Sequence, residues 1–467
     1  MMQRLLAWRR SLADPRSLYV LTLLLSFVAR VLAGRAASYF GGDWLMYSRV
    51  ADNILRGCGV SASDLATPHC APHFGGNGLP GYPWFLAALW WLFGRSQTVV
   101  IIAHAAIGAM ANVWLTRAVL VWSRSRVAAV ICALLLSVSP VQLVWAGAGL
   151  TEALAIAATA WILAELLLSL AEKRLRSVGL ALALAAAAFL RLDSVALIAP
   201  IALTAVMVHS PGQALKRLVL VGAIVALPLG LWTARNLVEG VNVLPAFGIQ
   251  PDGSAGPKGY LSWVYSWAVD EKQRAHAIFY ADKDYARISF PPDAYVDSHE
   301  RAQVAVLLDE LRHATGKPFP LRVDAEFARL AQNRLGREPW FAKVARPFER
   351  AFWLWSSWLS PLIGALGLTP IKVTATAYYR SGLLFAYAGL VAYAFMARRR
   401  DLQDFVVLAA VFFLARTILL VSVFAVEYSF LVEMAPIFEV AAALLAAQWL
   451  RALSRPATPR CTGECQP

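Results

Sequence analysis

The chain has 467 residues, of which 59% are hydrophobic and only 15% are charged, and its mean hydropathy is +0.56. Soluble domains carry about 25% charged residues, and long uncharged runs such as residues 127–144 would aggregate in water. This composition excludes an ordinary soluble protein. It predicts an all-α polytopic membrane protein, because its apolar runs approach the ~20 residues that cross a bilayer as a helix.

The formal net charge of +14 does not indicate a nucleic-acid partner, because of where the basic residues lie. Residues 236–348 carry basic and acidic side chains in equal measure, whereas short connections between the apolar runs are rich in Arg and Lys. Lys and Arg accumulate on cytoplasmic loops of membrane proteins. The excess therefore predicts topology, with both termini cytoplasmic in a multi-pass protein of the bacterial inner membrane.

Threading the basic clusters to one side predicts about ten transmembrane helices, with a range of about 9 to 13. The expected spans are residues 17–34, 98–121, 127–145, 153–171, 177–191, 194–210, 217–235, 376–397, 402–426 and 429–452. The first run also resembles a signal peptide. Two observations favour a retained helix: Arg30 lies near the end of the run, and the later basic clusters fall on the cytoplasmic side only if this run is counted as a span.

The spans suggest a division of the chain into modules. We expect an N-terminal catalytic membrane module at 1–235 with a first outer loop at 35–97, a partly helical periplasmic cap at 236–350, C-terminal membrane helices at 376–453 and a cytoplasmic tail at 454–467. Between them, residues 351–375 are expected to form an interfacial segment. A crossing at 351–368 would put Arg398–Arg400 outside, and the tryptophans of this segment suit the headgroup layer.

The first outer loop carries the stretch "GGDWLMYSRVADNILRG", which places Asp43 just after the first span. The residues that follow form an amphipathic helix at 43–57 with Trp44 and Tyr47 on its apolar face, a pattern typical of a helix lying on a membrane surface. A second short apolar segment at 81–94 contains Tyr82. Asp43 is a candidate general base, and its alternative role is an N-cap of the surface helix.

Cysteine placement fits an oxidising outer side. Cys58 and Cys70 lie in the first outer loop and are candidates for a disulfide. A zinc site of Cys58, His69, Cys70 and His73 is the alternative, although its spacing matches no common zinc pattern. Apart from zinc, a divalent cation is compatible with the sequence. No nucleotide or organic cofactor is expected, because "GGNG" lacks the Lys-Ser/Thr of a phosphate-binding loop.

Charged residues at the outer ends of later spans are further candidates. Glu152 begins a span and could bind a sugar hydroxyl or help hold a divalent ion, or simply favour a helix N-terminus. Arg191 and Arg235 end spans on the outer side against the positive-inside tendency, so they are candidate lipid-phosphate contacts, with snorkelling as the alternative. Lys258 in the cap is a looser phosphate candidate. Tyr82 and Tyr428 could stack on a sugar or serve as interfacial aromatics.

Several motifs in order resemble one family of proteins. In chain order the motifs are "GDWLMYSRVADNILRGCGV", "GLPGYPWFLAALWWLFG", "LTEALAIAATAWIL", "AAAAFLRLDSVALIAPIAL", "LPLGLWTARNLVEGVNVLP" and "VEYSFLVEMAPIFEVAAALL". Together they look like the bacterial GT-C glycosyltransferases related to protein O-mannosyltransferases and to the lipid A aminoarabinose transferase. The likeness covers roughly residues 17–245 and 376–452. The chain departs from the family at Trp44, where mannosyltransferases have a second acid, at Glu427, where many relatives have a basic residue, and at Asn77, which lies where a basic residue often precedes "PGYP".

The resemblance implies a GT-C-like bundle, a polyprenyl-phosphate sugar donor, an active site on the periplasmic face and an Asp of the first outer loop as catalytic base. The chemistry of Asp43 agrees, since a sugar on a lipid phosphate is already activated and needs only a base for the acceptor and cations for the phosphate. The acceptor is a lipid, glycan or protein, and inverting transfer is expected, with Tyr47, Tyr82, Glu427 and Tyr428 as substrate contacts. The alternative is a transporter or lipid flippase that uses intramembrane charges such as Arg117, Glu165, Arg416 and Glu439.

Overall fold

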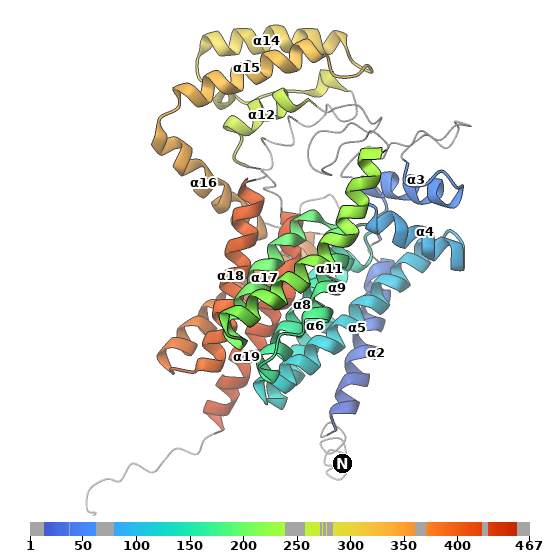
Figure 1. Cartoon of the computed structure of the whole chain (residues 1–467), viewed down its shortest axis with the longest axis vertical. Coiled ribbons are helices and arrows are strands. Elements are labelled where there is room, and N and C mark those ends of the chain that lie inside the picture. The colour runs from blue at the N-terminus through green and yellow to red at the C-terminus, as the bar shows by residue number, and fades with distance from the viewer. Residues whose placement is uncertain are drawn as a thin grey trace, which may run out of the picture.

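The computed structural model describes residues 14–36, 38–61, 79–238, 257–270, 273, 277, 284–359, 370–422 and 428–454. Throughout these ranges the regular structure is helical, and one isolated bridge between Tyr39 and Ala148 is the β-type pairing. The chain is therefore an all-α polytopic membrane protein, as predicted, built from a bundle of long apolar helices with a smaller helical cap at one end (Figure 1).

The bundle contains six helices that are long and apolar enough to cross a membrane within the described residues. They are α2 (Pro15–Ala36), α5 (Gln97–Ser123), α8 (Glu152–Glu172), α11 (Pro211–Val238), α18 (Arg400–Ser422) and the segment Leu431–Leu453, which joins η5 (Tyr428–Met434) to α19 (Ala435–Leu453). Beside them lie α9 (Ser177–Leu190), η1 (Leu192–Leu197) with α10 (Ile198–Val208), and α17 (Pro370–Met396). Each predicted span thus coincides with a helix or helix pair of the bundle.

The span expected at 127–145 is broken into α6 (Arg126–Val138) and α7 (Pro140–Ala146), which are bent by 41°. Ser139 lies at the break and its hydroxyl accepts a hydrogen bond from the backbone N–H of Gln142. Pro140 follows as the first residue of α7, where a missing N–H and a fixed φ do no harm. The break leaves α7 and the turn after it at the same end of the bundle as the cap (Figure 1).

Two short helices lie beside this end of the bundle, α3 (Asp43–Leu55) and α4 (Gly81–Phe93) (Figure 1). They correspond to the predicted surface helix and to the second short apolar segment. On α3 the buried side chains are Trp44, Tyr47, Ser48, Val50, Ala51 and Asn53, so the apolar face expected from the sequence packs inward. The cluster that receives it also contains Tyr82 and Trp90 of α4 and Leu154 of α8.

The cap consists of α12 (Lys258–Trp267), the short turns η3 (Tyr285–Arg287) and η4 (Pro292–Ala294), α14 (Ser298–His313) and α15 (Leu321–Arg337). Its core is aromatic, with Trp263, Tyr260 and Phe327 buried together. Asp297 caps α14 by accepting a hydrogen bond from Glu300 N at 2.7 Å. From the cap, α16 (Trp340–Leu359) returns to the bundle beside α18 (Figure 1).

Candidate functional site

The loop that carries Asp43 is tied to the turn that precedes α8. Tyr39 N donates to Gly147 O at 3.1 Å, and Gly149 N donates to Tyr39 O at 2.9 Å. Gly149 is required at this point, because a Cβ there would lie 2.4 Å from the Trp44 ring and 2.7 Å from the Phe40 ring. This close approach brings the start of α3 against the start of α8, and so brings Asp43 toward Glu152.

Asp43 is exposed and lies at the first position of α3. The N-cap is Gly42, with φ of 57°, and makes no side-chain capping hydrogen bond. The residue before the helix is therefore a glycine in a conformation that favours glycine, and Asp43 sits one position inside the helix. The sequence-based alternative, Asp43 as the N-cap, is not the geometry adopted, although a carboxylate in the first turn still interacts favourably with the helix dipole.

Tyr47 connects Asp43 to the buried part of the site. Burial raises the pKa of the Tyr47 phenol, the negative charges of Asp43 and Glu152 raise it further, and Arg191 with a hydrogen bond from Thr151 opposes them. The Tyr47 ring packs edge-on against Tyr82 at 5.2 Å, and the Tyr82 hydroxyl lies 3.3 Å from His104 Nε2. Burial also raises the pKa of Tyr82 well above its usual range. Both phenols therefore stay neutral and can act as hydrogen-bond donors.

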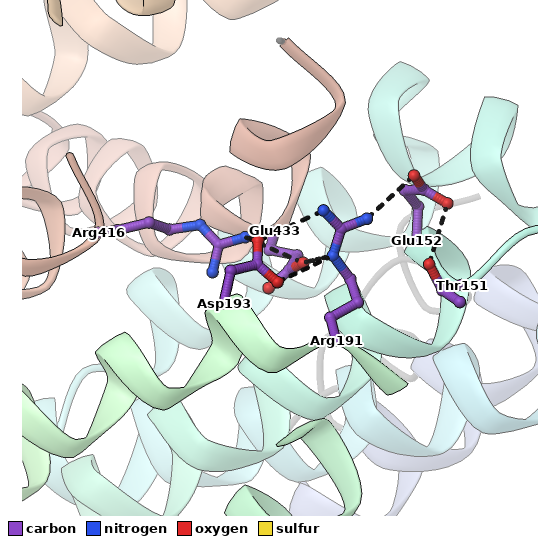
Figure 2. Close-up of polar contacts among 6 residues, drawn as sticks. All are labelled: Thr151, Glu152, Arg191, Asp193, Arg416 and Glu433. Carbon is purple, nitrogen blue, oxygen red and sulfur yellow. Dashed lines mark hydrogen bonds and ion pairs between the residues drawn. The ribbon is translucent and has the colours of Figure 1, made fainter. Parts of the chain in front are cut away.

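Behind Tyr47 lies a network of five charged side chains that we call the arginine network: Glu152, Arg191, Asp193, Arg416 and Glu433 (Figure 2). Arg191 occupies its centre, with Nη1 3.0 Å from Glu152 Oε1 and Nε 2.9 Å from Glu433 Oε1. Its Nε also lies 3.3 Å from Asp193 Oδ1. The Thr151 hydroxyl donates to Glu152 Oε2 at 3.4 Å.

Arg416 forms the far end of the arginine network. Its Nη2 lies 2.8 Å from Asp193 Oδ2 and 3.0 Å from Glu433 Oε1, and the side chains of both Arg416 and Glu433 are fully buried. The network thus joins η1, α8, α18 and η5 at the cap end of the bundle (Figure 2). With three carboxylates and two guanidiniums all ionised, it would carry one excess negative charge. Glu152, Arg191 and Asp193 each keep about a tenth of the side chain exposed, and Glu152 lies on the side of the network next to Tyr47.

The other predicted phosphate contacts lie apart from Arg191. Arg235, near the end of α11, is half-buried, donates to Val60 O at 3.4 Å and lies over the Trp232 ring at 5.1 Å. Val60 follows α3 in the first loop, so Arg235 links this loop to the bundle. Lys258 is exposed at the first position of α12 in the cap. Of the three predicted cations, only Arg191 belongs to the arginine network.

Some predicted residues fall wholly or partly outside what is described. Glu427, Cys70, His69 and His73 lie outside the described residues, and for Tyr428 only its place at the start of η5 is described. Cys58 takes part in a disulfide bond, and its pairing with Cys70 stays a prediction. A disulfide sulfur is not a thiolate ligand, which argues against the four-ligand zinc alternative. Among the described residues, no group of three or more His, Cys, Asp or Glu is arranged to hold a metal ion.

Sequence reasoning missed two members of the arginine network, Asp193 and Glu433, and noted Arg416 only as an intramembrane charge. A signal was available, because "RLDS" and "LVEMAP" place acids at the ends of apolar runs on the predicted side of Glu152 and Arg191. An acid at such a place predicts a partner for a nearby buried arginine.

The remaining intramembrane charges are paired elsewhere. Glu165 binds Arg176 at 2.6 Å and Trp114 Nε1 at 2.9 Å, and Arg117 lies over the same Trp114 ring at 4.6 Å. Glu439 accepts from Gln142 Nε2 at 2.6 Å and from the Tyr379 hydroxyl at 3.0 Å. These charges belong to separate local clusters rather than to one line of groups through the bundle.

Comparison with known proteins gives three similar solved structures. The chain is similar to ArnT from Cupriavidus metallidurans bound to undecaprenyl phosphate, with 18% identity over 86% of this chain and 76% of that one and a TM-score of 0.39. The apo form of the same protein matches at 16% identity over 90% and 77% of the two chains, also with a TM-score of 0.39. The Archaeoglobus fulgidus oligosaccharyltransferase tethered to an acceptor peptide matches at 14% identity, over 94% of this chain but 50% of that one, with a TM-score of 0.46.

No family model and no curated protein sequence matches the chain.

Proposed function

We propose that this protein is a membrane glycosyltransferase that moves a sugar from a polyprenyl-phosphate donor to an acceptor at the outer face of the bacterial inner membrane. The observation that carries the proposal is the pairing of residues 39 and 147–149, which brings exposed Asp43 beside the entrance to the arginine network. An exposed carboxylate next to neutral phenols and a buried charged network, at the end of a membrane bundle, is suited to acid–base chemistry on a lipid-linked substrate.

The reaction that fits this arrangement is a single displacement with inversion. The acceptor oxygen or nitrogen forms a bond to the anomeric carbon as its proton passes to the Asp43 carboxylate. The bond between that carbon and the phosphate oxygen breaks, and the polyprenyl phosphate leaves with the electron pair. Asp43 suits the first step because it is exposed and therefore accessible to an acceptor from outside the membrane.

Within this proposal the predicted cations have different tasks. Arg191 already contacts three carboxylates, so binding a phosphate would require it to leave at least one of them. We assign Arg191 to holding Glu152 in place for a sugar hydroxyl, and the donor phosphate to Arg235 with help from Lys258 of the cap. Arg235 fits because it lies at the end of a membrane-crossing helix, at the height where a lipid phosphate resides. Tyr47 and Tyr82 would donate hydrogen bonds to the sugar.

The test is the transfer rate of Asp43→Asn with a lipid-linked sugar donor. Undecaprenyl phosphate, the lipid bound in the ArnT structure, is the carrier to try first. The amide keeps the shape of the side chain but cannot take the proton, and a general base typically contributes 10²–10⁴-fold, so the rate should fall by about 3–5 kcal/mol in barrier. Loss of a helix-dipole interaction alone, about 0.3–1 kcal/mol, is too small to mimic this result.

The matched control is Asp52→Asn, which makes the same change on the same helix. Asp52 pairs with exposed Arg95 at 3.0 Å and lies away from the arginine network. Transfer should be unaffected in this variant. Near-normal transfer by Asp43→Asn would remove Asp43 from the mechanism and transfer the role of base to Glu152.

A further inference from the structure

Helix α16 exposes a continuous row of large apolar side chains, which we call the α16 stripe: Trp340, Phe341, Val344, Phe348 and Phe352. Each is between 52% and 76% exposed. Their spacing follows the 3.6-residue period of a helix, so they share one face. Over these residues the helix rises about 18 Å. A contiguous apolar surface of this kind on a soluble face would be an aggregation liability, and it therefore marks a binding surface.

The opposite face of α16 is polar and holds the cap. Arg350 is buried, and its guanidinium donates to Ala268 O at 3.3 and 3.1 Å and also to Tyr265 O, at the carboxyl end of α12. Arg346 pairs with Glu338, just before the helix. Lys343 and Glu349 fall on the same side. The helix thus turns its charges to the cap and leaves its apolar face uncovered.

The partner of the α16 stripe is indicated by Trp355, which lies on the same face one turn further along the helix. Trp355 Nε1 donates to Thr417 Oγ1 at 3.1 Å, and its ring packs edge-on against Phe413 at 5.9 Å. Both belong to α18, a membrane-crossing helix, near its cap end. Beside them α18 exposes Leu414 and Ile418, at 62% and 64%. The ring of Trp355 also lies 6.3 Å from that of buried Phe438 in α19. The carboxyl end of α16 thus packs on the membrane bundle, and the stripe leads away from this contact close to the exposed side chains of α18.

We propose that the α16 stripe inserts into the surface of the lipid bilayer at the cap end of the bundle and so seats the cap on the membrane. Interfacial amphipathic helices sink about 5–10 Å into the boundary between headgroups and acyl chains. A stripe about 18 Å long can reach that layer along its length only if α16 runs at a shallow angle to the membrane. α16 runs obliquely from the cap to the bundle beside α18 (Figure 1).

The proposal does not depend on the glycosyltransferase assignment, because it rests on the exposure and contacts of α16 alone. If α16 is inserted in the membrane and the protein is a glycosyltransferase, α16 fixes the height of the cap, and with it the height of Lys258, above a lipid-linked donor. α16 also packs against η5, the segment that carries Glu433. The membrane surface, the cap and the arginine network are then connected through one helix.

The experiment measures the collision of spin labels with oxygen, which concentrates in lipid, and with a water-soluble nickel chelate. The full-length protein, with Cys461→Ser and Cys465→Ser in its tail, is reconstituted into phosphatidylcholine nanodiscs, and single cysteines are introduced as Phe341→Cys, Phe348→Cys and Glu349→Cys. Glu349 is exposed on the opposite face of the same helix and is the matched control. The unsubstituted background reports labelling at the native cysteines.

The expected result is a higher ratio of oxygen to nickel collisions at Phe341→Cys and Phe348→Cys than at Glu349→Cys. Nickel-accessible labels at all three positions would show that the stripe lies in water and would overturn the proposal. Labels at the stripe that are protected from both reagents would show that protein, such as a second copy of the chain, covers it, and would overturn the proposal as well. Correct folding of each variant is checked by its elution as a monodisperse species before reconstitution.

Discussion

Arg416 and Glu433 illustrate how strongly a single residue can matter in this fold. Both side chains are fully buried, and each charge faces opposite charges in the arginine network. Two charges removed from water repay their desolvation only when their geometry and remaining hydrogen bonds are good. Removing one member therefore does more than delete an attraction, because its former partners stay buried with one opposite charge fewer.

We expect Arg416→Met to lower the free energy of unfolding by about 3–5 kcal/mol, the range for breaking a buried ion pair from one side. Adding Asp193→Asn should recover part of the loss, since the amide no longer needs the cation at 2.8 Å. The measurement is detergent-induced unfolding in mixed micelles. Arg95→Ala, at an exposed pair, is the control and should change stability by about 1 kcal/mol or less. Strictly additive losses in the double variant would contradict the coupling.

The sequence predicted Asp43, Glu152 and Arg191 as site residues. In the structure Glu152 and Arg191 contact each other directly, and Asp43 lies nearby. What could be inferred was the side and height of each charge, because these follow from span ends and basic clusters. Which charges touch could not be inferred, because Arg191 meets Glu433 across segments that are remote in sequence. Pairing across the bundle depends on helix packing, which periodicity does not encode.

At the scale of elements, the docking of α3 depends on one small residue. Trp44 of α3 and Phe40 before it lie where a side chain on Gly149 would have to be. Trp44 is buried and rigid, so it cannot give way as a flexible side chain would. Asp43 directly precedes Trp44 in the chain, so any displacement of Trp44 is passed to it directly.

Gly149→Ala is therefore expected to slow transfer while the helical content is unchanged. Overpacking typically costs about 1–3 kcal/mol, and a displacement of about 1 Å at a catalytic group can cost about 10²-fold in rate. Transfer assays and circular dichroism measure the two effects. The control is Gly222→Ala in α11, where an added Cβ meets open space and alanine favours the helix. Equal activity of both variants would show that α3 tolerates the shift.

The boundaries of most elements could be predicted because long apolar runs and the basic clusters between them leave few alternatives. Two elements differ from expectation for identifiable reasons. The span at 127–145 breaks at Ser139, since Pro140 ends one helix and begins the next. The interfacial segment is expected from the sequence to start at residue 351, whereas residues 351–359 are the second half of α16, a helix that begins at Trp340. The sequence assigns its first half to the polar cap because it contains Lys343, Arg346 and Glu349, although their spacing is helical. Residues 360–369 lie outside the described residues.

At the scale of the whole molecule, the cap and the ends of the first and last helices lie at opposite ends of the bundle. The first helix, α2, begins and the last helix, α19, ends at the end of the bundle away from the cap (Figure 1). The short turn at Lys173 and the turn at Arg398, both rich in basic residues, belong to connections that the sequence places on the cytoplasmic side. We therefore propose that the cap and the arginine network face the periplasm.

The decisive element for this topology is α17. It has 27 residues, about 40 Å of helix, which is enough to cross the hydrocarbon core with tilt. If α16 lies on the membrane and α17 crosses it, residues 372 and 398 are on opposite sides. If the chain crossed once more between α16 and α17, the turn at Arg398 would be outside, together with the basic residues on either side of it.

Single cysteines at these positions, Lys372→Cys and Arg398→Cys, distinguish the two topologies in intact cells treated with a membrane-impermeant maleimide. We expect Lys372→Cys to be labelled from outside and Arg398→Cys only after the membrane is permeabilised. Arg174→Cys, in the turn between α8 and α9, is the control for the inner side. Labelling of Arg398→Cys from outside, with Lys372→Cys reached only after permeabilisation, would contradict the interfacial position of α16, because the chain would then cross once more before α17. Labelling of Arg174→Cys from outside would instead reverse the whole bundle and place the cap, with Asp43 and the arginine network, in the cytoplasm.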